Sequence, residues 1–228
     1  MYKVFFKRIF DTIVSAITIV ILAPVFILIS ICIKLDSKGP VLFKQKRLGK
    51  RKKPFTVYKF RTMRIDAPCD IPTYFLEEAD KYITRLGKFL RRSSLDELPQ
   101  FVNVFIGQMS LVGPRPSQDN EYELIAAREK ANVYSILPGL TGLAQINGRD
   151  ELSQCAKAGY DAEYASSLSF WLDIKCLFKT VLRVISADGI VEGKKERNDT
   201  PITSAALSSK PLISIAKNRD TAQKKKTV

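Results

Sequence analysis

The chain of 228 residues is 46% hydrophobic, contains no histidine and carries a formal net charge of +14. Its length fits one sizeable domain, and the lack of histidine excludes a histidine-based catalytic triad. The scattered cysteines, Cys32, Cys69, Cys155 and Cys176, show no C-x-x-C spacing, which argues against a zinc site. Any catalysis must therefore use carboxylates, Lys, Arg, Ser, Tyr or a hard metal ion.

Residues 12–33, "TIVSAITIVILAPVFILISICI", form an uncharged apolar segment. At about 1.5 Å per helical residue, such a segment can cross a hydrocarbon layer of ~30 Å. It is longer than the apolar run of a secretory signal and no small-residue cleavage site follows it, so we expect it to be retained. Basic residues flank both ends: Lys3, Lys7 and Arg8 before it, and Lys34, Lys38, Lys44, Lys46 and Arg47 after it.

Two arrangements of this segment are compatible with its sequence. Basic flanks favour the cytoplasmic side of a membrane, so a straight span would leave one strongly basic flank outside. A bend at Ala23-Pro24 would return the chain to the face that it entered, because proline removes a helical hydrogen bond. A gently kinked single span is the alternative, because membrane helices tolerate proline.

Beyond the membrane segment, the sequence predicts a small β-hairpin and then mainly helices. Residues 40–49 and 53–63 alternate β-branched or aromatic residues with polar ones around a basic turn, which is typical of two strands. Residues 66–78 have the prolines of a surface loop, and the apolar spacing of residues 82–92 predicts an amphipathic helix. Arg115 lies between two prolines, which predicts a locked turn.

The C-terminal half contains one loop and one helix that each allow two interpretations. Residues 138–149, "PGLTGLAQINGR", contain three glycines and end in Arg149, which suits either a plain turn or a loop close to a ligand. Residues 166–186 predict a second amphipathic helix, either packed on a core or lying at a membrane surface. From residue 194 onward the chain is polar and basic, and we expect a mostly disordered tail.

The stretch "RRSSLDELPQ", residues 91–100, contains a basic pair and, after three further residues, two adjacent acids. Ser94 and Glu97 match the capping-box pattern S-x-x-E, in which the two side chains satisfy free amides at a helix start. Acids at such a position also suit the positive end of the helix dipole. Taken alone, this stretch therefore favours a capping role over catalysis.

Five motifs follow one another along the chain: "KRIFD", "YKFRTM", "RRSSLDELPQ", "SLVGPRP" and "PGLTGLAQINGR". On these motifs, residues 1–193 resemble the bacterial sugar transferases, the small monotopic phosphoglycosyl transferases. The resemblance implies an α+β, mainly α fold on the cytoplasmic face of the bacterial inner membrane. Its expected parts are a re-entrant helix-break-helix (1–36), a membrane-associated catalytic region with interfacial amphipathic helices and a small β-hairpin (37–193), and a basic tail (194–228).

The resemblance also implies a reaction. Enzymes of this family transfer a sugar 1-phosphate from a UDP-sugar to undecaprenyl phosphate, release UMP and initiate surface glycan assembly. The Asp-Glu dyad of the family falls on Asp96 and Glu97, with Asp96 as the nucleophile of a ping-pong reaction. We expect Mg²⁺ to neutralise the diphosphate, with Glu97, alone or together with Asp96, as its ligand.

The same resemblance implies roles for several basic residues. We expect Lys59, Arg91 and Arg115 to bind substrate phosphate or to organise the dyad, and Arg149 to contact the nucleotide. Two adjacent arginines precede the dyad, so the choice between Arg91 and Arg92 as the one that faces the site is left open.

The basic residues beside the apolar segment and the overall charge have a separate explanation. We expect Lys7 and Arg8 to anchor the segment at anionic lipid headgroups. The competing interpretation is a non-enzymatic, membrane-tethered basic protein that binds nucleic acid or acts as a scaffold. We expect no nucleic-acid partner, because the basic excess is spread along the chain rather than gathered on an aromatic-studded face. The sugar, the glycan pathway and the formation of a homo-oligomer are left open.

Overall fold

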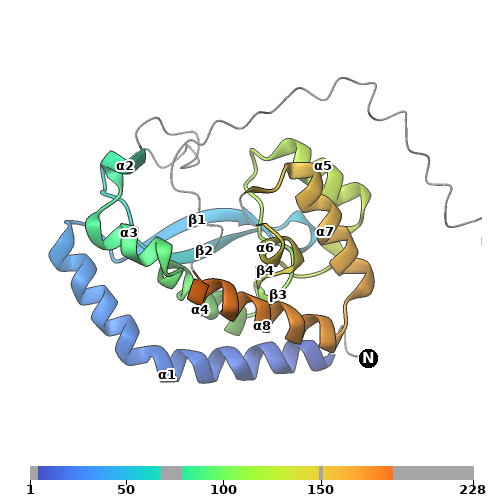
Figure 1. Ribbon diagram of the computed structural model, residues 1–228, viewed down its shortest axis with the longest axis horizontal. Helices are drawn as coiled ribbons and strands as arrows, with labels where there is room; N and C mark the ends of the chain where they lie inside the picture. The colour runs from blue at the N-terminus through green and yellow to red at the C-terminus, as the bar shows by residue number, and fades with distance from the viewer. Residues whose placement is uncertain (1–4, 68–78, 149–150, 187–228) are drawn as a thin grey trace, which may run out of the picture. The chain divides into compact units, whose positions relative to one another are not determined.

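The computed structural model describes residues 5–67, 79–148 and 151–186, which belong to one compact unit within residues 1–193. Among the described helices, only α1 (Lys7–Asp36) has the length and apolar composition needed to cross a membrane. The resemblance implied a helix break at Ala23-Pro24, while the residues alone left a gently kinked helix as the alternative; α1 continues through Pro24 as one helix. Its ribbon curves in Figure 1, which is consistent with the hydrogen bond to the Val20 carbonyl that proline cannot donate.

Helix α1 lies along one side of the remaining described structure (Figure 1). Its inner face is polar in the first half, where Lys7, Asp11 and Ser15 are buried, and apolar in the second half, where Ile29 and Ile33 are buried. Its outer face exposes a row of large apolar residues: Ile9, Ile13, Ile17, Val20, Ile21, Ile27, Leu28, Ile31 and Leu35. Both halves of the helix are therefore packed on the same unit, while the outer face has no cover among the described residues.

The predicted hairpin is confirmed. Strands β1 (Leu42–Leu48) and β2 (Pro54–Phe60) pair in antiparallel fashion, with Phe43 opposite Lys59, and the basic turn η2 (Lys50–Lys52) joins them. Next to the hairpin, Phe60 packs with Ile29 and Ile33 of α1 in a small apolar cluster. This contact places the end of β2 close to the C-terminal end of α1.

The single helix predicted over residues 82–92 is divided in the structure. A short helix α2 (Ala79–Tyr82) ends before Ile83, and α3 (Arg85–Arg92) begins after Thr84. Between them, Ile83 forms an isolated antiparallel bridge with Met63, and the Thr84 side chain caps α3 by accepting a hydrogen bond from Gly87 N. Strand-like pairing with residues 62–63 therefore overrides the helical pattern at this point.

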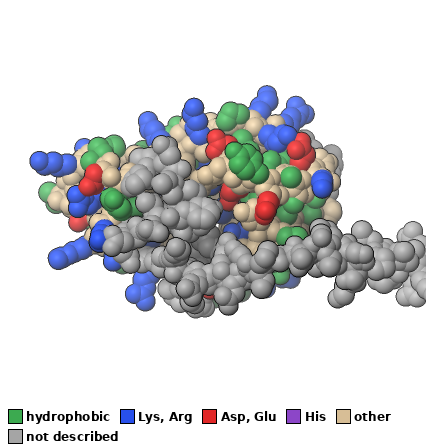
Figure 2. Space-filling view, turned by 90° about the horizontal axis from the view of Figure 1, so that it is seen from above, with side chains coloured by type: hydrophobic (Ala, Val, Ile, Leu, Met, Phe, Trp, Pro, Cys, Tyr) green, Lys and Arg blue, Asp and Glu red, His purple; other side chains and the backbone are tan. Residues whose placement is uncertain are grey.

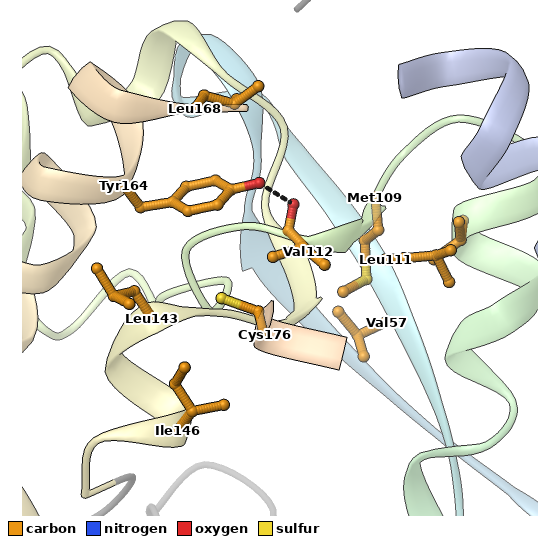
Figure 3. Packing of buried hydrophobic residues seen from close by; sticks show 10 residues of the cluster. Val57, Met109, Leu111, Val112, Leu143, Ile146, Tyr164, Leu168 and Cys176 are labelled. Carbon is orange, nitrogen blue, oxygen red and sulfur yellow. Dashed lines mark hydrogen bonds between the residues drawn. The ribbon is translucent and has the colours of Figure 1, made fainter. Parts of the chain in front are cut away.

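The rest of the described chain forms short elements around the main core. In chain order these are η4 (Leu95–Glu97), α4 (Gln100–Phe105), β3 (Ser110–Val112), α5 (Tyr122–Lys130), η5 (Val133–Ser135), β4 (Gly139–Thr141), α6 (Leu143–Ile146), α7 (Gln154–Ser167) and α8 (Phe170–Ser186). Strands β3 and β4 pair in parallel, a pairing that the sequence analysis did not predict. Figure 3 shows the core around them, where the Tyr164 hydroxyl donates to the Val112 carbonyl at 3.0 Å.

Helix α8 agrees with the second predicted amphipathic helix. It buries Asp173 and Cys176 against the core, but the predicted apolar stripe itself is largely exposed: Trp171, Phe178 and Val181 are 76%, 65% and 58% exposed. The interpretation of this stripe as a core face is therefore wrong for these residues. The described structure is mainly helical with two small sheets, and it carries its largest exposed apolar rows on α1 and α8.

Candidate active site

The two adjacent acids lie in η4, a single 3-10 turn between α3 and α4. Ser94, at its N-terminal end, has left-handed backbone angles (φ 57°) and its side chain caps no amide of this turn. The capping box predicted from S-x-x-E is therefore wrong. The cause is the left-handed conformation, because an N-cap residue needs extended backbone angles to point its side chain back at the first amides.

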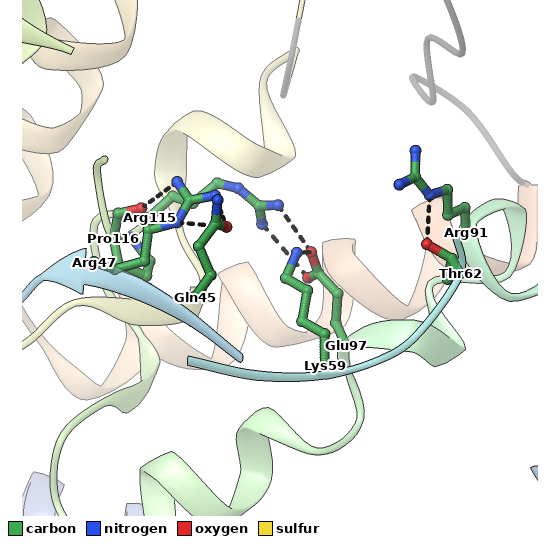
Figure 4. Close-up of polar contacts among 8 residues, drawn as sticks. All are labelled: Gln45, Arg47, Lys59, Thr62, Arg91, Glu97, Arg115 and Pro116. Carbon is green, nitrogen blue, oxygen red and sulfur yellow. Dashed lines mark hydrogen bonds and ion pairs between the residues drawn. The ribbon is translucent and has the colours of Figure 1, made fainter. Parts of the chain in front are cut away.

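Glu97 is the centre of an ion-pair cluster (Figure 4). Its Oε1 accepts hydrogen bonds from Lys59 Nζ and from Arg115 Nη2, each at 2.8 Å, and its Oε2 lies 3.4 Å from Arg115 Nη1. Burial by itself would raise the pKa of Glu97, but Arg115 and Lys59 outweigh burial and hold this pKa well below its usual value. Glu97 is therefore ionised and binds two cations that come from β2 and from the turn after β3.

Asp96 has a different environment, although it lies directly before Glu97 in the chain. Within the described chain, no group donates a hydrogen bond to its carboxylate. Burial raises its pKa to about 6, with a further contribution from the negative charge of Glu97, while Lys59, Arg91 and Arg115 act in the opposite direction. Asp96 is thus a carboxylate that is surrounded by cations but bonded to none of them, with its oxygens available to a ligand.

Arg91 reaches the site from the last turn of α3. Its Nε donates to Thr62 Oγ1 at 2.8 Å, and α3 can approach Thr62 because Gly87 has no side chain. A Cβ on Gly87 would lie 2.0 Å from the Thr62 carbonyl oxygen. Arg91 is half-buried and acts on the charge of Asp96, whereas Arg92 is exposed. Of the two adjacent arginines, Arg91 is thus the one that faces the dyad. Figure 4 shows that Arg91 lies apart from Arg115.

The turn that carries Arg115 is held on both of its sides. Gly113 N donates to the Thr141 carbonyl at 2.7 Å, and Gly139 N donates to the Pro114 carbonyl at 2.8 Å. Arg128 Nη1 donates to the carbonyl of Arg115 itself at 2.9 Å. These bonds fix the backbone of the predicted turn, so that the Arg115 side chain leaves it toward Glu97.

Two further pairs support this turn, and the sequence analysis missed both. Arg128 donates from Nε and Nη2 to Asp161 Oδ2 at 2.8 and 2.6 Å, and both side chains are buried. On the other side, Arg47 donates twice to Gln45 and once to the Pro116 carbonyl (Figure 4). Helices α5 and α7, which carry the first pair, were not predicted, so no sequence signal placed these residues near Arg115.

The structure corrects the expected role of Lys7 and Arg8. Lys7 is buried and forms an ion pair with Asp173 at 2.6 Å, and Arg8 donates to the carbonyls of Val104 and Phe105. Both side chains thus attach α1 to the catalytic part instead of reaching out to lipid headgroups. The remaining predicted residue, Arg149, lies outside the described residues.

The dyad offers carboxylate oxygens of the kind that bind Mg²⁺. No cluster of three or more acidic or cysteine side chains occurs in the described ranges. Mg²⁺ is, however, commonly held by one or two carboxylates together with phosphate oxygens of a substrate, and Asp96 offers such a carboxylate. Glu97 already accepts from Lys59 and Arg115, so it would bind a metal ion only by sharing its oxygens with these cations.

Comparison of the sequence with known proteins places the chain in a family. The sequence model described as "Bacterial sugar transferase" matches residues 2–187. The UDP-glucose:undecaprenyl-phosphate glucose-1-phosphate transferase of Klebsiella pneumoniae is 42% identical over 186 residues, which cover 78% of this chain and 40% of that protein. The protein of the same name from Caulobacter vibrioides is 39% identical over 191 residues (80% of this chain, 70% of that protein).

A shorter relative covers nearly the same length as this chain. The uncharacterised sugar transferase EpsL of Bacillus subtilis is 41% identical over 185 residues, which are 81% of this chain and 89% of that protein. By contrast, the chain spans only 36–40% of the length of three larger glucose transferases that it matches. The match of the family model over almost all described residues shows that the chain belongs to the bacterial sugar transferase family.

Proposed function

We propose that the protein transfers a sugar 1-phosphate from a UDP-sugar to undecaprenyl phosphate and releases UMP. The observation that carries this proposal is the contrast within the dyad. Glu97 is bonded to Lys59 and Arg115, whereas Asp96 is surrounded by cations without a hydrogen bond to any described residue. The names of the larger relatives, which are undecaprenyl-phosphate glucose-1-phosphate transferases, support the same reaction.

The proposed reaction has two steps. In the first step, an Asp96 carboxylate oxygen forms a bond to the β-phosphorus of the donor, and the bond from this phosphorus to the bridging oxygen breaks. UMP leaves with the electron pair on that oxygen, and a sugar-phosphoryl group remains on Asp96 as an acyl phosphate. In the second step, an oxygen of undecaprenyl phosphate attacks the same phosphorus, and the Asp96 carboxylate leaves unchanged.

The charges around Asp96 suit this attack. A carboxylate that approaches a diphosphate meets electrostatic repulsion, which nearby cations reduce. Arg115, Lys59 and Arg91 are the cations that act on Asp96, and a guanidinium presents paired donors to phosphate oxygens. Arg115 is the best placed of them to meet the diphosphate, because 39% of its side chain is exposed while its backbone is fixed.

Mg²⁺ belongs to the proposal because a diphosphate is strongly anionic. When bound, it would neutralise part of the diphosphate charge, held by Asp96, by shared oxygens of Glu97 and by phosphate oxygens. The role of Glu97 toward Asp96 does not depend on the metal. Glu97 holds Lys59 and Arg115 close to the nucleophile, so its removal would leave both cations without their anchor.

We further propose that α1 enters and leaves the membrane on one face. Near its start, Lys7 binds Asp173, and just after its end the Ser37 carbonyl accepts from Arg61 at 2.7 Å. A helix whose two ends contact one compact unit cannot place that unit on one side of the membrane and also span it. The exposed apolar rows of α1 and α8 are suited to contact with lipid, and Trp171 on α8 is an aromatic residue typical of the interface.

The alternative of a nucleic-acid-binding protein has less support. Figure 2 shows Lys and Arg side chains spread over several places on the visible face, with acidic side chains between them. Counterion release from nucleic acid favours a continuous basic surface. The ion pairs of Lys59 and Arg115 with Glu97 direct two of the cations to a catalytic dyad instead.

The covalent intermediate provides the test. Wild-type protein incubated with Mg²⁺ and a panel of UDP-sugars, without lipid, should gain the mass of one sugar phosphate and release UMP. Asp96→Asn should show neither event, because an amide lacks the anionic oxygen, and Glu97→Gln should lose most of the activity. An active wild type that never shows the adduct, together with an Asp96→Asn variant that turns over normally, would refute the mechanism.

A further inference from the structure

The side chain of Gln145 is buried, and the described residues offer it no hydrogen-bond partner. Gln145 lies in α6 with 6% of its surface exposed, and neither its Nε2 nor its Oε1 is bonded within the described ranges. Buried carboxamides are nearly always hydrogen-bonded, so this group calls for a ligand or another explanation.

The position of Gln145 relative to the dyad is fixed by backbone contacts. Gly142, at the start of α6, touches the turn that carries Arg115: a Cβ on Gly142 would lie 2.1 Å from the Gly113 carbonyl oxygen. The same Cβ would lie 2.9 Å from Gln145 Oε1. Leu143 and Ile146, on either side of Gln145 in α6, belong to the main core (Figure 3). The carboxamide therefore lies near the backbone that leads, two residues later, to Arg115.

We propose that Gln145 recognises the uracil ring of the sugar-nucleotide donor. This inference rests on the proposed function, in which Arg115 meets the diphosphate. A neutral carboxamide is poorly suited to phosphate, but it matches the neutral imide edge of uracil, where an N–H lies between two carbonyl oxygens. The Gln145 oxygen accepts from the uracil N–H, and its amide nitrogen donates to an adjacent carbonyl, in two parallel hydrogen bonds.

The stability change on removing the unsatisfied carboxamide distinguishes a ligand-binding role of Gln145 from a structural role. If Gln145 serves only a ligand, its replacement by Leu removes an unsatisfied polar group from the interior and leaves the fold as stable or more stable. If Gln145 serves the fold, the same change destabilises it. Gln108 is the matched control, because its Oε1 accepts a hydrogen bond from Asn103 Nδ2 at 2.7 Å within the protein.

The experiment compares Gln145→Leu and Gln108→Leu in the full-length protein. For each variant we would measure the thermal unfolding midpoint, the affinity for UMP, and kcat and KM for the UDP-sugar that wild type accepts. For Gln145→Leu we expect an unfolding midpoint that is unchanged or higher by up to about 4 °C. The Kd for UMP and the KM should both rise about tenfold, with a smaller change in kcat. Gln108→Leu should unfold at a lower temperature and bind UMP normally.

A second variant covers the case in which Gln145→Leu does not fold. Gln145→Met has nearly the same length and suits a buried position, but it offers neither an N–H nor a carbonyl oxygen, so it loses both hydrogen bonds to uracil. We expect its preference for UMP over CMP to fall at least tenfold relative to wild type. An unchanged UMP to CMP ratio would overturn the inference.

The outcomes separate this inference from the proposed function. A Gln145→Leu variant with normal UMP affinity and a lower unfolding temperature would show that Gln145 is structural. Normal UMP affinity with a raised KM for the UDP-sugar would assign Gln145 to the sugar and would also overturn the inference. A wild type that binds UMP through Gln145 but transfers no sugar phosphate would refute the proposed function and leave the uracil contact standing.

Discussion

We expect Asp161→Asn to lower the thermal unfolding midpoint of the protein strongly and to impair sugar-phosphate transfer. Arg128 and Asp161 form an ion pair in which the side chains are only 3% and 1% exposed. The Asn side chain can still accept a hydrogen bond, but it carries no charge to compensate the buried guanidinium. Removal of one partner from a buried pair costs about 3–5 kcal/mol.

The expected size of the thermal shift follows from the size of the domain. For a domain of 150–250 residues, 1 kcal/mol shifts the unfolding midpoint by roughly 2–4 °C. Asp161→Asn should therefore lower the midpoint by about 6–20 °C in a thermal scan followed by circular dichroism in detergent. Because Arg128 also donates to the Arg115 carbonyl, kcat/KM for sugar-phosphate transfer should fall even at temperatures where the variant is folded.

A double variant separates stability from positioning. Burial raises the pKa of Asp161 although Arg128 lowers it. Replacement of a whole buried ion pair by apolar residues of similar volume is often neutral or stabilising. Arg128→Met combined with Asp161→Leu should therefore regain most of the lost stability. It should not regain activity, because no guanidinium then holds the Arg115 carbonyl. A single variant within about 1 kcal/mol of wild type, or a double variant with full activity, would refute this reasoning.

Four other predictions test the site and the membrane arrangement. Burial raises the pKa of Asp96 to about 6, so kcat/KM should fall about tenfold per pH unit below that value; a flat profile would contradict an ionised nucleophile. Because the pKa of Asp96 is raised in the folded protein, its protonated form stabilises the fold at low pH, and this stabilisation is lost as the pH rises through about 6. At pH 8, Asp96→Asn should therefore unfold at a higher temperature than wild type. Arg115→Lys should lower kcat/KM at least about tenfold with little change in the unfolding midpoint, because charge is kept while the paired donors are lost; normal kinetics would remove Arg115 from the phosphate site. Cysteines introduced by Lys3→Cys and Lys38→Cys should react with a membrane-impermeant label from the same side of intact vesicles, whereas opposite accessibility would exclude the re-entrant arrangement.

Much of the local structure around Asp96 and Glu97 could be predicted because these residues and their neighbours lie in local motifs. The alternation in residues 40–63 predicted the hairpin that carries Lys59, and the two prolines around Arg115 predicted its locked turn. These signals act over a few residues and depend on the chain's own periodicity. The same local reasoning failed at Ser94, where the left-handed backbone excludes the predicted cap.

The contacts that the sequence did not reveal connect distant parts of the chain. Lys7 pairs with Asp173 across 166 residues, and Asp11 accepts from the Ser110 hydroxyl across 99 residues. No periodicity encodes such a partner, so Lys7 was assigned to lipid on the basis of its neighbours alone. The pair of Arg128 and Asp161 joins two helices, α5 and α7, that were not predicted either. For these residues, only the tertiary packing determines the role.

The polar first half of the inner face of α1 has a consequence for the chain during its synthesis at the ribosome. Lys7 and Asp11 leave the ribosome long before their partner residues, and the 166 residues between Lys7 and Asp173 take roughly 10–30 s to add at bacterial elongation rates. During this interval the apolar part of α1 can already associate with lipid, while Lys7 and Asp11 are one helical turn apart and can only neutralise each other. The nascent helix must therefore keep this end near water until α8 is made, and a chain truncated before Asp173 would leave Lys7 without its partner on α8.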